Sequence, residues 1–237
     1  MTNIILITSG SRPRLLAQTL RTLYVNTPAD QYTLTMVTDG HMEFPFDQDW
    51  GERISVIGMR PPCNIVGRLK NLGAYWSEKQ FGRGEWICFI DDDVAFFPGW
   101  LGQMTAATNV CQMIGGNRHP YHGVNEEITW GSIPGGTFRP GQEIEVTTQT
   151  IQITDAVAGY CHFMRWETWD RFGPYDAHAK GTGQSEDFAI CREIVDAGGK
   201  VGYIHPPVMA HCGVTDSLGR PAIGMEKIQR KLGVLYE

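Results

Sequence analysis

A short apolar run that ends in three consecutive aspartates is the feature that most limits how this chain can fold. Residues 86–90 (WICFI) are all apolar, and Asp91, Asp92 and Asp93 follow without a break. A run of this length, apolar at every position, is typical of a strand buried on both faces of a parallel sheet. Adjacent carboxylates repel one another and raise one another's pKa unless a cation compensates them. The pattern therefore predicts a central strand whose carboxyl end concentrates negative charge.

The segments before this run alternate between strand and helix patterns. Strands are expected at 3–8, 32–38 and 54–58, because these runs are short, apolar and rich in β-forming residues. Helices are expected after the first strand, to about Val25, and after the third, with Asn64 as N-cap, because apolar residues recur there at helical spacing. Strands that alternate with helices predict an α/β sandwich of three layers, with a mainly parallel central sheet.

The acidic triplet falls at the edge where such sheets bind ligands. Thr8, Asp39 and Asp91 each end an expected strand, and ligands of open α/β sheets bind beyond the carboxyl ends of the strands. Residues two apart on a strand point to the same side, so Asp91 and Asp93 can face one ligand while Asp92 points away. Mg²⁺ or Mn²⁺ with oxygen ligands is one interpretation. A solvated loop or a helix N-cap run is the other, and spacing alone leaves both open.

The second half of the chain has a different character. Residues 115–155 are rich in Gly, Pro, His and Thr, which predicts long loops around one strand at 147–153, as an insertion that lines a site. Further elements are expected as strands at 156–165 and 201–204 and as helices at 186–197 and from about 225.

Composition limits the remaining possibilities. The 237 residues, 42% of them hydrophobic, predict one compact domain over 1–237. A net charge of −6 argues against a protein that wraps nucleic acid non-specifically. The six cysteines include no Cys-x-x-Cys pair, and the N-terminus has neither a basic leader nor an apolar stretch of about 20 residues. These features predict reduced thiols, no transmembrane segment and a cytoplasmic location.

Several motifs, in order along most of the chain, resemble glycosyltransferase family 2 and its relatives with the GT-A fold. The similar segments of the first half are 7–13 (ITSGSRP), 38–40 (TDG), 67–73 (GRLKNLG) and 89–94 (FIDDDV). Those of the second half are 158–165 (AGYCHFMR), 172–176 (FGPYD), 185–188 (SEDF) and His211. The chain departs from the family at Lys70, where the family's helix motif has an arginine. The resemblance implies a Rossmann-like GT-A sandwich, with 1–98 as the nucleotide-sugar-binding half and 99–237 as the acceptor-binding and catalytic half.

The resemblance also implies a donor and a metal. The donor is a nucleoside-diphosphate sugar, with a UDP-sugar as the first expectation, and the metal is Mn²⁺ or Mg²⁺ bridging its two phosphates. The implied metal ligands are Asp91, Asp93 and His211, although a lone histidine at an apolar strand end is more often a core residue. The residues expected to contact the donor are Thr8, Ser9, Arg12, Asp39, Arg68, Asn71, Asp91 and Asp92.

The catalytic assignment rests on Glu186 and Asp187. In the family the aspartate of this pair is the general base that takes a proton from the acceptor hydroxyl, which implies inversion at the anomeric carbon. Carboxylates are also common at a helix start because they favour the positive end of the macrodipole. We favour Asp187 as the general base, although the sequence alone does not distinguish it from Glu186.

The acceptor site is less determined. Trp130, Tyr121, His122 and Tyr160 offer flat faces for stacking, and glycines near 131–136 and residues 215–224 are expected to form lids. A saccharide, a lipid-linked precursor, a protein or a modified nucleobase all remain open as acceptors. The alternative functions are a nucleotidyltransferase on a similar fold and a catalytically inactive carbohydrate-binding relative.

Overall fold

In the computed structural model the described residues are 1–8, 12–40, 51–63, 65–117, 124–135, 145–176 and 186–212. Their helices are α1 (Pro13–Asn26), α2 (Val66–Phe81), α3 (Trp100–Ala107), α4 (Trp166–Phe172) and α5 (Glu186–Asp196), with short 3-10 turns at Ala29–Gln31 and Gly51–Arg53. Their strands are β1 (Thr2–Thr8), β2 (Tyr32–Asp39), β3 (Ile54–Met59), β4 (Trp86–Asp91), β5 (Val94–Phe96), β6 (Met113–Gly115), β7 (Glu126–Gly135), β8 (Glu145–Thr154), β9 (Cys161–Arg165), β10 (Val201–His205) and β11 (Met209–His211).

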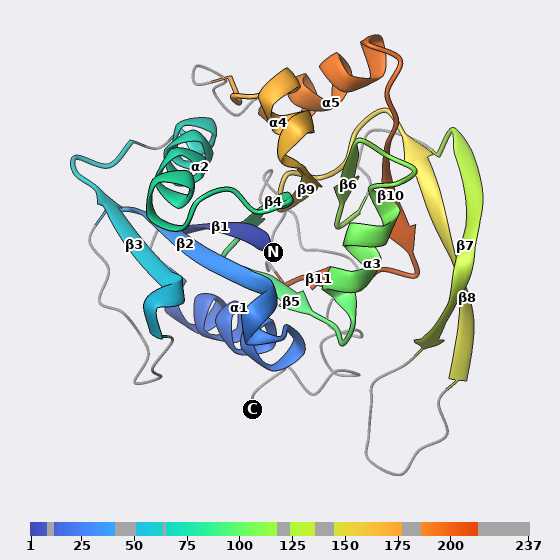
Figure 1. Ribbon diagram of the computed structural model, residues 1–237, viewed down its shortest axis with the longest axis horizontal. Helices are drawn as coiled ribbons and strands as arrows, with labels where there is room; N and C mark the ends of the chain where they lie inside the picture. Colours follow the sequence, from blue (N-terminus) through green and yellow to red (C-terminus); the bar gives the residue numbers. More distant parts are fainter. Residues whose placement is uncertain are drawn as a thin grey trace.

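One large sheet runs through the molecule in the order β3-β2-β1-β4-β9-β6-β10-β8-β7 (Figure 1). The four strands of the first half pair in parallel. β9 pairs antiparallel with both β4 and β6, and β8 pairs antiparallel with both β10 and β7. Within this sheet β9 and β8 therefore run against the other strands, which share one direction. The predicted α/β sandwich with a mainly parallel sheet is confirmed.

Two apolar cores lie on opposite faces of the sheet, and the helices that cover them form the outer layers. Along β1, Ile4 and Leu6 enter one core, while Ile5 and Ile7 enter the other. The first core is completed by α1 and α3, and the second by α2, α4 and α5 (Figure 1). Side chains of a strand alternate between faces, so a strand that is apolar at every position is the sequence signature of this arrangement.

A second, two-stranded sheet pairs β5 with β11 antiparallel, and His211 lies opposite Val94. These strands are more than a hundred residues apart in the chain. The pairing brings the start of β5, directly after the acidic triplet, to the end of the described chain.

The expected elements agree with the structure where local pattern is strong. The strands of the first half and the helix at 186 are confirmed within one or two residues. The second expected helix begins at Val66 with Ile65 as its N-cap, and Asn64 lies outside the described residues. The strand expected at 156–165 begins only at Cys161. The C-terminal helix expected from about 225 also lies outside the described residues.

The segment 115–155 differs most from the prediction of long loops. It contains β7, a ten-residue strand that pairs with β8 along its length, with a register shift between Thr129 and Gly131. Gly131, Pro134 and Gly135 made this strand look like a loop in the sequence, because glycine and proline are depleted in strands. Of the helices that the structure describes, none combines the length and the apolar character needed to cross a bilayer.

Close packing of α2 on the sheet gives the first prediction. A Cβ on Gly73 would lie 2.2 Å from Ile5 Cγ2 and 3.0 Å from Val37 Cγ2, both in the buried sheet. We expect Gly73→Ala to lower the free energy of unfolding by about 1–3 kcal/mol, because the helix must shift to admit a methyl group. Urea unfolding measures this. Gly102→Ala in α3 is the control, since a Cβ there meets nothing within 4 Å and alanine is expected to be neutral or slightly stabilising. Equal effects of the two substitutions would contradict the prediction.

Candidate active site

The acidic triplet lies where β4 ends and the chain turns into β5. Asp91 is the last residue of β4, and its N–H donates to the Tyr160 carbonyl at 3.0 Å. Asp92 and Asp93 form the turn and are buried, with 0% and 2% of their surfaces exposed. The strand alternation expected for the three aspartates is wrong, because the triplet leaves the strand after its first member. Asp92 therefore does not point away from Asp93, and the two share one cationic partner.

That partner is Arg12, the N-cap residue of α1. Its Nη1 donates to Asp93 Oδ2 at 2.5 Å, and its Nη2 donates to Asp92 Oδ1. Thr8, at the end of β1, donates its hydroxyl to the other oxygen of Asp92 at 2.6 Å. Thr8 and Arg12, both expected at the donor site, therefore reach the acidic triplet itself.

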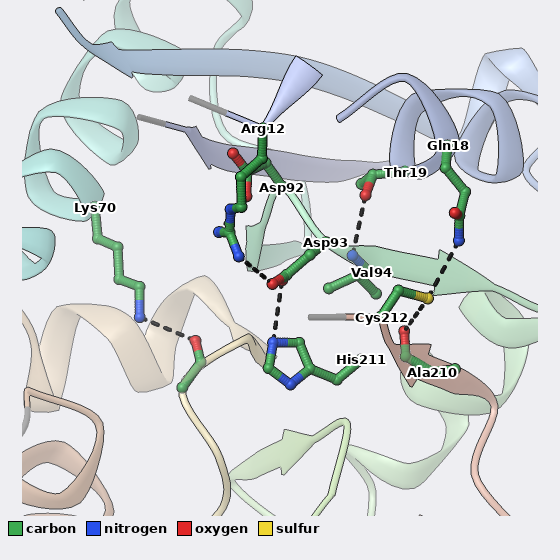
Figure 2. Close-up of polar contacts among 11 residues, drawn as sticks. Arg12, Gln18, Thr19, Lys70, Asp92, Asp93, Val94, Ala210, His211 and Cys212 are labelled. Carbon is green, nitrogen blue, oxygen red and sulfur yellow. Dashed lines mark hydrogen bonds and ion pairs between the residues drawn. The ribbon is translucent and has the colours of Figure 1, made fainter. Parts of the chain in front are cut away.

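His211 approaches Asp93 from the side opposite Arg12 (Figure 2). The ladder between β5 and β11 positions it, and the Cys212 N–H donates to the Asp93 carbonyl at 2.6 Å. His211 Nε2 lies 3.1 Å from Asp93 Oδ1. The imidazole stacks on the Tyr160 ring with centroids 4.6 Å apart and planes 2° from parallel. The histidine is therefore fixed by backbone pairing, by an aromatic ring and by a carboxylate.

The residues around Asp93 fit a hard divalent cation. Asp93 Oδ1 is buried without a well-aligned hydrogen bond, although His211 Nε2 is near it. Adjacent ligands of an octahedral ion with bonds of about 2.1 Å lie about 3 Å apart, which matches the separation of these two atoms. Among the described residues, no three His, Cys, Asp or Glu side chains form a group suited to a metal. Asp93 and His211 could therefore supply two ligands to such a cation, and the remaining positions would fall to substrate phosphates and water, as is common for Mg²⁺.

Burial and charge pull the pKa values of the triplet in different directions. Burial raises the pKa of Asp91 to about 7, against the opposing charge of Lys70. Burial also raises the pKa of Asp92, despite hydrogen bonds from Thr8 and Arg12. Burial acts likewise on Asp93, but His211 and Arg12 outweigh it and lower the pKa of Asp93. Burial disfavours the charged form of His211, yet Asp93 outweighs that effect and raises the pKa of His211.

A second charged group lies beside the triplet, around Lys70 of α2. Lys70 is 1% exposed, and its Nζ donates to the Gly159 carbonyl at 3.0 Å and to Glu186 Oε1 at 3.1 Å. The same ammonium lies 5.0 Å from the centre of the Tyr175 ring. The residue that replaces the family's arginine is thus a buried partner of Glu186.

Asp187 is held in place at the start of α5. Its Oδ2 accepts from the Gly159 N–H at 3.0 Å, and its Oδ1 accepts from the Phe188 N–H at 2.9 Å. A Cβ on residue 159 would lie 2.9 Å from Asp187 Oδ2, so the carboxylate can approach this backbone only at a glycine. Asp187 is 8% exposed. Gly159 thus gives its N–H to one predicted catalytic residue and its carbonyl to the lysine that neutralises the other.

The remaining expected donor contacts are spread along the edge of the sheet. Asp39 Oδ1 accepts from the Cys63 N–H at 2.5 Å, which ties the end of β2 to the loop before α2. Asn71 exchanges two hydrogen bonds of 2.9 Å with the Tyr175 backbone, so its amide holds a loop. Arg68 is exposed on α2. Ser9 lies outside the described residues.

Of the residues expected at the acceptor site, only Tyr160 has a described side chain. It is 8% exposed and stacks on His211. Trp130 and Gly131 fall in β7, and Gly135 ends that strand, but their side chains or surroundings are not described. Tyr121, His122 and the lid expected at 215–224 lie outside the described residues.

Sequence reasoning missed the partners that organise these groups. It expected Arg12 to reach phosphates, whereas its guanidinium pairs with Asp92 and Asp93. It gave Gly159 no role, although the glycine contacts both Lys70 and Asp187. A lysine in a helix and a glycine before a strand are weak signals of a functional contact. Nothing in the sequence around either residue indicates which distant residue it will contact.

Comparison with known proteins assigns the fold. No protein-family model matches the sequence, and no curated protein matches it. Similar solved structures include GalNAc-T7 with UDP, GalNAc and Mn²⁺, at a TM-score of 0.61 and 15% identity over 89% of this chain and 44% of that one. The mannosyltransferase PcManGT from Pyrobaculum calidifontis, in complex with GDP-Man and Mn²⁺, is similar at a TM-score of 0.55 and 11% identity over 97% and 60%. Residues 1–349 of S. aureus TarS in complex with UDP give 0.55 and 11% over 86% and 57%.

These likenesses show that the chain has the GT-A glycosyltransferase fold. The fold expected from the motif resemblance is therefore confirmed. The chain spans about half the length of these three structures, between 44% and 60% of each.

The half-buried Asp91 gives a prediction for stability against pH. Its pKa rises from 3.8 to about 7 on folding, so between these values the unfolded state releases a proton that the folded state keeps. The free energy of unfolding must then fall as pH rises through this window. We expect Asp91→Asn to stabilise the metal-free protein at pH 8 by on the order of 2 kcal/mol and to flatten the slope between pH 4 and 7.

Urea unfolding in chelator across this pH range measures the effect. A loss of stability should remain in the variant above pH 6.5, because folding raises the pKa of His211 from 6.5 and the stability that this gives is lost as the imidazolium deprotonates. Asp30→Asn, at an exposed carboxylate, is the control. An unchanged slope in Asp91→Asn would show that this carboxyl does not keep its proton.

Proposed function

We propose that this protein is a metal-dependent, inverting glycosyltransferase that moves a sugar from a nucleoside-diphosphate sugar to an acceptor hydroxyl. The observation that carries the proposal is the buried Asp93, with His211 3.1 Å away, at the carboxyl edge of a GT-A sheet. Similar folds are seen with UDP and Mn²⁺ in GalNAc-T7 and with GDP-Man and Mn²⁺ in PcManGT. A UDP-sugar is our first choice of donor.

Asp93 and His211 would hold Mn²⁺ or Mg²⁺, with Asp91 beside them. The bound cation supplies charge stabilisation to the diphosphate as it leaves. Asp39 lies at the end of β2 on the same edge, where it can meet the ribose or base. Arg12 and Arg68 are the cations of the described edge that can reach phosphates, whereas Lys70 is committed to Glu186.

Asp187 is our choice of general base. The Gly159 and Phe188 N–H groups donate to its two oxygens and so hold the carboxylate in one orientation. Glu186 is paired with the buried Lys70 ammonium, so its carboxylate is already engaged in an ion pair. The acceptor hydroxyl would lose its proton to Asp187 as its oxygen attacks the anomeric carbon from the face opposite the diphosphate, so the configuration inverts.

Donor binding tests the first part of the proposal. Calorimetric titration with a panel of UDP- and GDP-sugars should show binding to at least one donor that strengthens in Mn²⁺. Asp93→Asn and His211→Ala should each remove most of the Mn²⁺ effect, because each deletes one ligand. Binding of sugar without nucleotide or metal would instead favour the carbohydrate-binding alternative. Failure of every donor to bind would refute the proposal.

Substitution of the two acids tests the choice of base. We expect Asp187→Asn to lower the rate of sugar transfer about 10²- to 10⁴-fold, the usual contribution of a general base, with donor affinity unchanged. Slow transfer to water provides a readout without a known acceptor, and NMR of the first-formed sugar should show the inverted anomer. Glu186→Gln, the matched control, should reduce the rate less. The opposite order of effects would assign the base to Glu186.

A further inference from the structure

Arg12 occupies both carboxylates of the turn that follows β4. One guanidinium nitrogen pairs with Asp93 Oδ2 and another with Asp92 Oδ1, so the planar fork bridges two different side chains (Figure 2). The two carboxylates are 0% and 2% exposed, whereas the Arg12 side chain is 43% exposed. The carboxylates are thus fixed, and the cation is the partner with access to solvent.

The place of Arg12 in the fold also favours its release. It is the N-cap of α1 but makes no side-chain capping hydrogen bond. A cation at a helix N-terminus meets the positive end of the macrodipole, which is unfavourable by several tenths of a kcal/mol. The ion pairs with Asp92 and Asp93 therefore hold Arg12 in this position. The Lys70 ammonium, at 1% exposure and bonded to Glu186 and Gly159, has no comparable route to solvent.

Arg12 and a divalent cation compete for Asp93. A cation bound between Asp93 and His211 would share that carboxylate with the guanidinium, and two positive groups on one small carboxylate repel each other strongly in a buried site. When Arg12 leaves Asp93, the cation would compensate that carboxylate. Asp92 keeps the hydrogen bond from the Thr8 hydroxyl, and Arg12 is the cation that pairs with it in the metal-free protein.

We propose that Arg12 is an exchangeable counter-ion, which neutralises Asp92 and Asp93 in the metal-free protein and must leave Asp93 when a divalent cation binds. Arg12 thereby sets the metal affinity of the site, and its release frees a guanidinium at the edge where the donor phosphates would lie. This inference rests on the proposed function for the identity of the metal ligands.

Manganese binding without nucleotide tests the exchange. The measurement is a Mn²⁺ titration at fixed ionic strength, followed by the EPR signal of the free ion. We expect Arg12→Gln to bind Mn²⁺ about tenfold more tightly than the unmodified chain, because the competing charge-assisted hydrogen bonds are gone. Arg12→Lys should fall between the two, since an ammonium cannot bridge both carboxylates as the fork does.

Two controls isolate the effect. Arg14→Gln, at an exposed arginine in the first turn of α1, makes the same change in net charge and should leave the Mn²⁺ affinity unchanged. Asp93→Asn should abolish binding with either residue at position 12, which assigns the measured ion to this site. Circular dichroism and thermal unfolding establish that each variant is folded. If Arg12→Gln is not folded, the Mn²⁺ affinity of Arg12→Lys tests the exchange in its place.

The outcomes separate this inference from the proposed function. Binding that needs Asp93 but is equal or weaker in the Arg12 variants would overturn the exchange and leave the metal site standing. Absence of Mn²⁺ binding in folded unmodified and variant chains alike would overturn both the exchange and the metal dependence of the proposed function.

Discussion

Neutralisation of the negative charge at the end of β4 is the constraint around which the site is organised. Three carboxylates lie at the tip of a strand that is buried on both faces, and the aspartates of the turn are almost wholly buried. Like charges in such surroundings are strongly unfavourable without cations. The cations come from distant parts of the chain: Arg12 from the start of α1, Lys70 from α2 and His211 from β11. Each requires its own element to be in place, so the charge at β4 ties the outer layers and the small sheet to the central strand.

The three cations differ in how firmly they are held, and we infer a different role for each from this difference. Lys70 is buried, bonded to two partners and seated near the Tyr175 ring, so it behaves as a permanent part of the framework. His211 is fixed by the β5–β11 ladder and by Tyr160, and its neutral form can donate a lone pair to a metal. Arg12 is the most exposed of these three cations, with 43% of its side chain exposed against 33% for His211 and 1% for Lys70. In the exchange that we propose, Arg12 is therefore the cation that leaves when an external one binds.

Sequence patterns predicted the parts of this structure that depend on neighbours in the chain. Short runs of apolar and β-branched residues predicted β1 to β4, and β4 is apolar at every position before Asp91 because it is buried on both faces. The motif resemblance pointed to Asp93, His211 and Asp187, which lie far apart in the chain, and their assignment to one site remains a prediction. Local pattern failed where tertiary pairing decides: β7 is a strand despite Gly131 and Pro134 because β8 lies beside it. The orientation of Asp92 was also mistaken, because no pattern marks the residue at which a strand becomes a turn.

The antiparallel direction of β9 explains how one loop can serve both halves of the site. A strand parallel to β4 would begin at the opposite edge of the sheet, whereas β9 begins at the edge where β4 ends. The residues just before β9 therefore lie against the acidic triplet: the Tyr160 carbonyl accepts the Asp91 N–H, and its ring supports His211. The preceding residue, Gly159, binds Asp187 through its N–H and Lys70 through its carbonyl. Two consecutive residues thus fix the proposed metal ligand His211 and the proposed base Asp187 relative to each other, so movement of this loop would displace both together.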